Sequence, residues 1–168
     1  NELQHMLYTA TLYQGPVAVR YPRGSGQGVE MKQDLQKLPI GVGELLREGS
    51  DVLLLPVGNR VYPALEAAEG LRKVGIEAAV INPRFIKPLD NELICTWAEK
   101  TGRVVTIEDN MKKGGFGSAV LQMLNEMHLR APVRLLGYGN TFIEHGPQHI
   151  LWKNSGIDVA GIIRGAME

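Results

Sequence analysis

Val52-Leu53-Leu54-Leu55-Pro56-Val57-Gly58 opens the stretch of sequence that decides the fold, and this stretch runs on to Asp90. A helical pattern follows the first apolar run, and a second apolar run, Ala78-Ala79-Val80-Ile81, comes after the helix. Strands that are apolar on both faces belong inside a parallel sheet that helices cover. A strand, a helix and a strand over this length form one right-handed βαβ crossover. The stretch therefore predicts an α/β fold.

Length, charge and cysteine content limit what the protein can be. The 168 residues suit one medium domain, or one domain with a piece of another. Lysine plus arginine number 18 and aspartate plus glutamate also number 18, which argues against nucleic-acid or membrane-surface partners. The single cysteine, Cys95, fits a reducing compartment. No apolar run approaches the roughly 20 residues that a membrane-spanning helix needs, and no signal-peptide pattern is present.

The first 24 residues indicate part of another domain. The chain opens at Asn1 without a methionine, and apolar residues recur at helical spacing over residues 2–13. Gly15-Pro16 breaks the pattern, and Val17-Ala18-Val19-Arg20-Tyr21 predicts a strand. One helix and one strand make no core, so we expect a helix–strand remnant of a preceding α/β domain within a longer polypeptide. Residues 25–38 are polar and rich in glycine, and they predict a linker.

Residues 39–168 predict a three-layer α/β sandwich with about five strands, mostly parallel. An edge strand is expected within residues 38–48, a third buried strand at residues 104–107 and a further strand at residues 132–136. We expect the helices to be delimited by the capping residues Asn59, Asp90 and Asp158 at their starts and by Gly75 and Gly102 at two of their ends.

Two guanidinium groups flank a proline in Val19-Arg20-Tyr21-Pro22-Arg23-Gly24. Pro22 forces Tyr21 to be extended, so Tyr21 and Arg23 point to one side and Arg20 to the other. Arginine suits bidentate capture of a phosphate, and tyrosine can add a hydroxyl. Ligands of α/β domains gather at the carboxyl ends of strands, where Arg23 would lie. The alternative is a pair of surface or interdomain salt bridges, which spacing alone favours.

Six segments in register resemble the 1-deoxy-D-xylulose-5-phosphate synthase family. Residues 15–24 resemble the end of that family's pyrimidine-binding domain. The other five are, in order, Leu38-Pro39-Ile40-Gly41 with Gly43, Arg84-Phe85-Ile86-Lys87-Pro88-Leu89-Asp90, Val105-Thr106-Ile107-Glu108-Asp109-Asn110, Gly114-Gly115-Phe116-Gly117-Ser118-Ala119-Val120 and Phe142-Ile143-Glu144-His145-Gly146. The resemblance covers nearly the whole chain. No single motif is decisive, but six in register are specific.

The resemblance implies a thiamine-diphosphate enzyme of the transketolase class, which joins pyruvate, after decarboxylation, to glyceraldehyde 3-phosphate. It implies that residues 1–24 are the tail of the pyrimidine-binding domain, 25–38 a linker and 39–168 a transketolase-like C-terminal domain. The arginine of the family's Tyr-Pro-Arg-Gly motif binds the phosphate of the acceptor and maps onto Arg23. Tyr21 and Arg20 are expected to support it.

The resemblance also implies that the cofactor binds elsewhere in the polypeptide. This chain has no Gly-Asp-Gly with a downstream asparagine to hold Mg²⁺ and diphosphate, and the family's glutamate that activates thiamine lies upstream of Asn1. We therefore expect no catalytic residue, metal ligand or cofactor site on this chain, and no activity from it alone. Its role would be to scaffold the enzyme and to hold a homodimer, in a bacterial cytoplasm or a plastid stroma.

The glycine loop Gly114-Gly115-Phe116-Gly117 resembles a phosphate cradle at the start of a helix. Its spacing is not Gly-x-Gly-x-x-Gly, so a tight structural turn is favoured over a regulatory anion site assisted by Lys112 and Lys113. His145 and His149 are separated by Gly146-Pro147, which disfavours a shared metal ion.

The remaining candidates favour structural roles. We interpret Arg84, at the end of a strand, as forming a salt bridge to another domain or subunit. We interpret Glu108-Asp109 as a solvated strand exit rather than an acid–base pair. Cys95 is interpreted as an inert, partly buried thiol. His5 and His128 have no evident partner and receive no role.

Two other functions stay open at this point. The β-type subunit of 2-oxo-acid dehydrogenases has the same last domain, where it serves subunit association. The Tyr-Pro-Arg-Gly and Phe-Ile-Glu-His-Gly segments favour the synthase over this alternative. A free-standing ligand-binding protein that uses the glycine loop is the third hypothesis.

Overall fold

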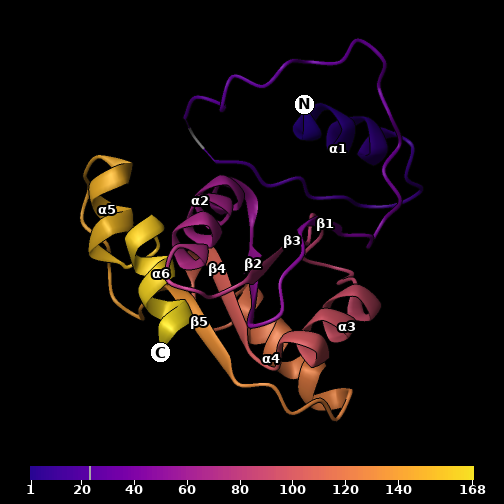
Figure 1. Cartoon of the computed structure of the whole chain (residues 1–168). Helices are drawn as coiled ribbons and strands as arrows, with labels where there is room; N and C mark the ends of the chain where they lie inside the picture. Colours follow the sequence, from indigo (N-terminus) through magenta and orange to yellow (C-terminus); the bar gives the residue numbers. More distant parts are fainter. Residues whose placement is uncertain (23) are drawn as a thin grey trace.

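The computed structural model describes residues 1–22 and 24–168, which form a sheet domain and an N-terminal arm, residues 1–43 (Figure 1). The sheet has the strand order β1-β3-β2-β4-β5. Its strands are β1 (Glu44–Arg47), β2 (Val52–Pro56), β3 (Ala78–Asn82), β4 (Val104–Met111) and β5 (Val133–Tyr138). Strands β2 to β5 run parallel to one another, and β1 pairs antiparallel with β3. The predicted α/β class with a mostly parallel sheet is confirmed.

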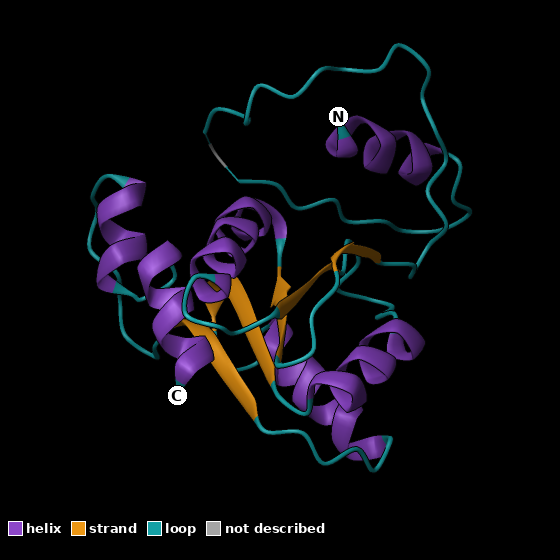
Figure 2. Cartoon of the chain, in the orientation of Figure 1, coloured by secondary structure: helices purple, strands orange, loops and turns teal. Residues whose placement is uncertain are grey.

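Helices cover both faces of this sheet (Figure 2). One face carries α2 (Val61–Arg72) and α6 (Val159–Met167), and the other carries α3 (Asn91–Thr101) and α4 (Phe116–Glu126). The buried strand β2 divides its side chains between them. Val52 and Leu54 pack with the first pair of helices, and Leu53 and Leu55 with the second. Since all four are fully buried, the predicted three layers are confirmed.

Most of the predicted helix ends are also confirmed. Asp90 accepts a hydrogen bond from the Leu93 N–H at 3.0 Å, and Asp158 accepts one from the Gly161 N–H at 2.9 Å. Gly102 ends α3 in the left-handed region, with φ of 67°. The prediction for Asn59 is wrong, because a 3-10 turn, η1 (Gly58–Arg60), precedes α2 and Asn59 bonds elsewhere.

The N-terminal arm contains α1 (Glu2–Thr11) and then runs without regular structure to β1, through the described residues. The strand predicted at residues 17–21 is therefore wrong. A strand needs a hydrogen-bonded neighbour, and the sheet order places none beside this segment. Val17 and Tyr21 are 48% and 64% exposed. The edge strand predicted within residues 38–48 is confirmed, but it is limited to Glu44–Arg47.

The returning part of the arm is hydrogen-bonded to one side of α1. The N–H groups of residues 32, 36 and 38 donate to Asn1 Oδ1, His5 Nδ1 and Thr9 Oγ1 at 2.9, 3.1 and 2.8 Å, respectively. His5 and Thr9 are buried. His5 therefore has a structural role that the sequence did not indicate, since it anchors the predicted linker to the helix.

None of the helices in the described ranges is both long enough and apolar enough to cross a membrane.

Candidate functional site

The carboxyl ends of β2 to β5 lie at one edge of the sheet, and several segments singled out from the sequence leave it. The loops that leave this edge carry Arg84, the glycine loop and residues 142–146. The N-terminal arm reaches the same edge, because Glu44, the first residue of β1, pairs with Asn82, the last residue of β3. This is the edge at which α/β domains bind ligands.

The predicted phosphate-binding segment is described at residues 19–22 and at Gly24, and Gly24 lies near α5 (Gln148–Asn154). Arg20 and Tyr21 are exposed, and Arg23 lies outside the described residues. Gly24 lies beside the start of α5, since a Cβ built on it would be 3.4 Å from Gln148 Oε1. The phosphate-binding role of Arg23, with support from Tyr21 and Arg20, stays a prediction.

Arg60 is a buried cation that the sequence analysis did not single out. It is only 1% exposed, although it lies in the turn between β2 and α2. Its Nη1 donates to the carbonyl of Ile157 at 3.1 Å and its Nε to Asn59 Oδ1 at 3.1 Å. The guanidinium lies 3.7 Å from the centre of the Trp152 ring. Burial lowers the pKa of Arg60, and the negative charge of Asp109 opposes this effect.

Asp109 is the acceptor at the centre of this buried cluster. Its Oδ1 accepts from the Tyr138 hydroxyl at 2.6 Å, and its Oδ2 accepts from Asn59 Nδ2 and Trp152 Nε1, each at 3.0 Å. Burial raises the pKa of Asp109, but these three hydrogen bonds and Arg60 outweigh it, so the pKa is lowered. Burial and the bond to Asp109 raise the pKa of Tyr138. Because Trp152 belongs to α5, the cluster fastens α5 to the end of the sheet.

Glu108 holds the glycine loop from inside. Strand β4 continues through Met111, and Glu108 is only 2% exposed. Its two carboxylate oxygens accept hydrogen bonds from the N–H groups of Phe116 at 2.8 Å and Gly117 at 2.9 Å. The carboxylate occupies the position that an external anion would take at the start of α4. The loop is therefore a structural turn, as favoured from the sequence.

The prediction that Glu108-Asp109 is a solvated strand exit is wrong. The sheet extends past Ile107, so both carboxylates are drawn into the domain, and Asp109 is partly buried. All four of their oxygens accept hydrogen bonds from groups of this chain. These contacts give both carboxylates structural roles. The geometry of this edge supports binding and positioning of groups.

Arg84 joins the N-terminal arm to the sheet domain. It has a positive φ of 56°, and its N–H donates to Asn82 Oδ1 at 3.1 Å. Its guanidinium pairs with Glu2 of α1, at 2.7 Å from Nε, and also with Glu44 of β1. Asn82 Nδ2 donates to the same Glu2 carboxylate at 3.0 and 3.1 Å. The predicted salt bridge is therefore present and lies between the arm and the sheet domain.

The other candidates form no chemical site among the described residues. His145 lies in a loop and His149 in α5, and both are exposed. Within the ranges described, no group of three or more His, Cys, Asp or Glu side chains is placed to hold a metal ion. Cys95 is partly buried, with its sulfur 3.5 Å from that of Met123. Burial and the charge of Glu99 raise the pKa of its thiol, which agrees with an inert role.

The fold described above is that of the transketolase C-terminal domain family, and this chain belongs to that family. The profile of the family, described as "Transketolase, C-terminal domain", matches residues 41–162. A curated relative from Desulfotalea psychrophila, named 1-deoxy-D-xylulose-5-phosphate synthase, is 59% identical over 171 residues, 99% of this chain and 26% of its own length. A relative of the same name from Desulforudis audaxviator is 51% identical over 99% of the chain and 26% of its own length. The chain thus spans about a quarter of the length of these relatives.

Solved structures agree with this assignment. The structure named "Split gene transketolase, inactive beta4 tetramer" has a TM-score of 0.83 at 32% identity, over 97% of this chain and 52% of that one. The transketolase of Campylobacter jejuni has a TM-score of 0.56 at 20% identity, over 76% of this chain and 18% of that one. The second similarity concerns the fold alone.

Proposed function

We propose that this chain is the C-terminal portion of a 1-deoxy-D-xylulose-5-phosphate synthase. That enzyme condenses pyruvate with glyceraldehyde 3-phosphate, with loss of CO₂, and supplies precursors of isoprenoids and thiamine. The observation that carries the proposal is the 59% identity over 99% of the chain. This match extends through residues 1–40 of the N-terminal arm, which lie before the general family profile at residues 41–162.

The proposed division of labour leaves the cofactor chemistry to other parts of the polypeptide. Residues 1–24 would end the pyrimidine-binding domain, 25–38 would form the linker and 39–168 the C-terminal domain. Thiamine diphosphate and Mg²⁺ would bind upstream, and the internal hydrogen bonds of Glu108 and Asp109 at the edge of the sheet support this. The chain would contribute to a homodimer in the cytoplasm or the plastid stroma and would be inactive alone.

Arg23 would grip the phosphate of glyceraldehyde 3-phosphate, with Tyr21 and Arg20 as supporting residues. Gly24 passes the start of α5 at the ligand-binding edge of the sheet, which supports this role. The interaction would be a charge-assisted, bidentate hydrogen bond to the phosphate oxygens. Pyruvate has no phosphate and would make no such contact.

Steady-state kinetics of Arg23→Ala in the intact enzyme test this function. Losing a hydrogen bond to a charged group costs about 1.5–3 kcal/mol, so KM for glyceraldehyde 3-phosphate should rise about 10- to 100-fold. KM for pyruvate should stay unchanged. Arg23→Lys keeps the charge but loses the bidentate geometry and should give an intermediate value. Equal losses for both substrates would show that Arg23 is a structural residue.

A second candidate function is subunit association without catalysis, as in the last domain of the β-type subunit of 2-oxo-acid dehydrogenases. The similar structure of a split-gene transketolase, named an inactive tetramer, favours this candidate. Sedimentation equilibrium of the chain tests it. A stable dimer or tetramer at micromolar concentration is expected, and a monomer at all concentrations would rule out an assembly role for the isolated chain.

A further inference from the structure

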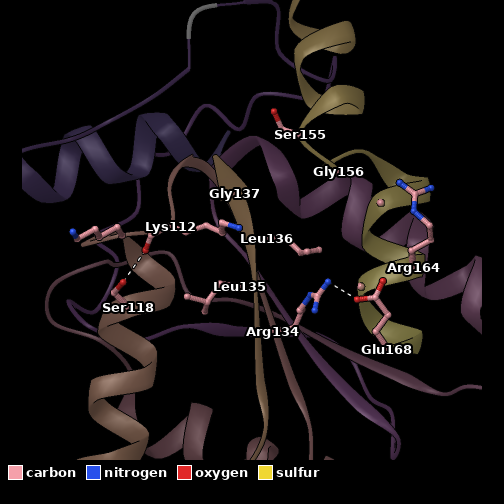
Figure 3. A pocket seen from close by; sticks show the side chains of 13 residues that line it. Lys112, Ser118, Arg134, Leu135, Leu136, Gly137, Ser155, Gly156, Arg164 and Glu168 are labelled. Carbon is pink, nitrogen blue, oxygen red and sulfur yellow. Dashed lines mark hydrogen bonds and ion pairs between the residues drawn. The ribbon is translucent and has the colours of Figure 1, made fainter. Parts of the chain in front are cut away.

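A groove follows the free edge of β5, outside the phosphate-binding segment discussed above. Among the residues that the structure describes, β5 is the last strand of the sheet and pairs only with β4. Beside its open edge lies a cavity of about 720 Å³, between α4 and α6 (Figure 3). We call this the β5 groove, and its charged lining residues are Lys112, Lys113, Arg134, Arg164 and Glu168.

Charge distinguishes the β5 groove from the rest of the protein. The whole chain has as many basic as acidic residues, 18 of each. The groove sets four cationic side chains against the single carboxylate of Glu168. Figure 3 shows Lys112 on one side of β5 and Arg134 on the other, with Arg164 on the neighbouring helix. Cations brought from a loop, a strand and a helix to one concave surface favour an anion there.

The cations come from rigid elements. Lys112 is fixed at its backbone, since its N–H donates to the Tyr138 carbonyl at 3.0 Å and its carbonyl accepts from the Ser118 hydroxyl at 2.7 Å. Its Cγ would lie only 3.1 Å from a Cβ on Gly137, so the side chain lies against the face of β5 that is turned to α4. Arg134 lies within β5 itself and Arg164 in the last turn of α6. The backbone positions of these residues are therefore fixed without a bound ligand.

The one internal counter-charge is easily displaced. Arg134 pairs with Glu168, and the two side chains are 54% and 56% exposed. An exposed ion pair of this kind contributes little to stability, so an incoming anion loses little by separating it. A phosphate would then accept two parallel N–H bonds from the freed guanidinium, the geometry for which arginine is best suited.

The volume of the groove is suited to a small molecule. About 720 Å³ lies within the range of small-molecule clefts, roughly 300–1,000 Å³. A nucleic acid would need a continuous basic surface, which the balanced charge of the chain does not provide. The backbone N–H groups of the nearby glycine loop are unavailable, because Glu108 takes those of Phe116 and Gly117. Recognition therefore depends on the side chains of the groove.

We infer that the β5 groove binds a small phosphorylated molecule, whose phosphate is held by Arg134 and Arg164 on the α6 side of β5, while Lys112 faces the part of the ligand on the α4 side. The site lies apart from the acceptor-phosphate role proposed for Arg23 and does not depend on catalysis. It is suited to a regulatory ligand, because the neighbouring carboxylates of β4 are fully engaged in structural hydrogen bonds.

Titration of the full chain with inorganic pyrophosphate at low salt, followed by calorimetry and by backbone amide NMR, tests the inference. Saturable binding is expected, with shifts concentrated at residues 112, 134 and 137. Arg134→Gln should weaken binding about 10-fold or more, the loss typical of a charged hydrogen bond. Arg164→Gln should also weaken it, and both side chains are exposed, so the fold should be retained.

Two charge-matched variants make the test specific. Glu168→Gln removes the competing carboxylate and should tighten binding, whereas Lys73→Gln removes an exposed cation at the end of α2 and should leave it unchanged. If Lys73→Gln and Arg134→Gln weaken pyrophosphate binding equally, binding depends only on the overall charge of the protein, and the proposed site is wrong. Absence of saturation, or tighter binding of a single-stranded oligonucleotide than of pyrophosphate, would overturn it as well.

Discussion

The carboxylate of Glu108 accepts a hydrogen bond from the backbone N–H of Gly117 at 2.9 Å, so an internal side chain closes the start of α4. An anion at this position interacts favourably with the helix dipole and satisfies N–H groups that have no partner within the helix. The glycine loop thus owes its shape to a buried residue of the preceding strand.

Glu108→Gln should destabilise the domain by about 1–3 kcal/mol, because a neutral amide offers one acceptor oxygen where the carboxylate offers two. Urea denaturation at neutral pH measures the change in the free energy of unfolding. Glu99→Gln, on an exposed part of α3, is the matched control and should change it by less than about 0.5 kcal/mol. Equal stabilities of the two variants would contradict the role given to Glu108.

Gly115→Ala should destabilise the domain by about 1–3 kcal/mol through overpacking. A Cβ at this position would lie 2.2 Å from the Met111 carbonyl and 2.3 Å from Glu108 Oε2, so the backbone would have to move. Gly26→Ala places the same methyl group where nothing lies within 4 Å and serves as the control. Thermal denaturation compares the two, and an unchanged midpoint for Gly115→Ala would show that the loop is not closely packed.

Asp109→Asn should make stability less sensitive to acid. The pKa of Asp109 in the folded state lies below its ordinary value of 3.8. Its carboxylate therefore contributes stability that is present above that value and is lost as pH falls through the folded pKa. At pH 7 the substitution should cost about 3 kcal/mol, because it leaves Arg60 buried without its nearby negative charge.

Urea denaturation between pH 7 and pH 3 checks this dependence. The difference in unfolding free energy between the parent chain and Asp109→Asn should be constant down to roughly pH 5 and should shrink below it. A difference that stays constant over the whole range would mean that the charge of Asp109 does not stabilise the cluster.

Glu2→Gln and Arg84→Gln should loosen the N-terminal arm while leaving the sheet domain folded. The ion pair joins α1 to the loop after β3, and Arg84 is 18% exposed. A double-mutant cycle should give a coupling of about 1 kcal/mol in the opening free energy of α1, measured by amide hydrogen exchange. Arg72→Gln, which breaks the exposed pair with Glu69 on α2, is the control and should leave α1 unchanged. Additive effects of Glu2→Gln and Arg84→Gln would contradict a direct interaction.

The sheet and its layers were predictable because their signals are local. Unbroken apolar runs marked β2 and β3, and Asp90 and Asp158 capped the helices that they precede. The helix start assigned to Asn59 failed because a distant partner, Asp109, competes for its side chain across 50 residues of sequence. The strand expected at residues 17–21 failed because strand-forming residues need a neighbouring strand.

The buried cluster could not be predicted from the sequence. Arg60 is bonded to Ile157, 97 residues away, and Asp109 to Trp152, 43 residues away. No spacing rule connects such positions, and a lone arginine before a helix ordinarily indicates a solvated residue. Arg23, the residue singled out from its motif, lies outside the described residues, so its role depends on the kinetic test proposed above.

The reversed direction of β1 has a consequence for the architecture of any longer polypeptide. A fifth parallel strand would deliver the preceding chain to the opposite rim of the sheet, far from the loops that follow β2 to β5. Running antiparallel, β1 instead places whatever comes before it over the mouth of the domain. One inverted strand thereby decides that the N-terminal arm lies over the loop-bearing side of the sheet.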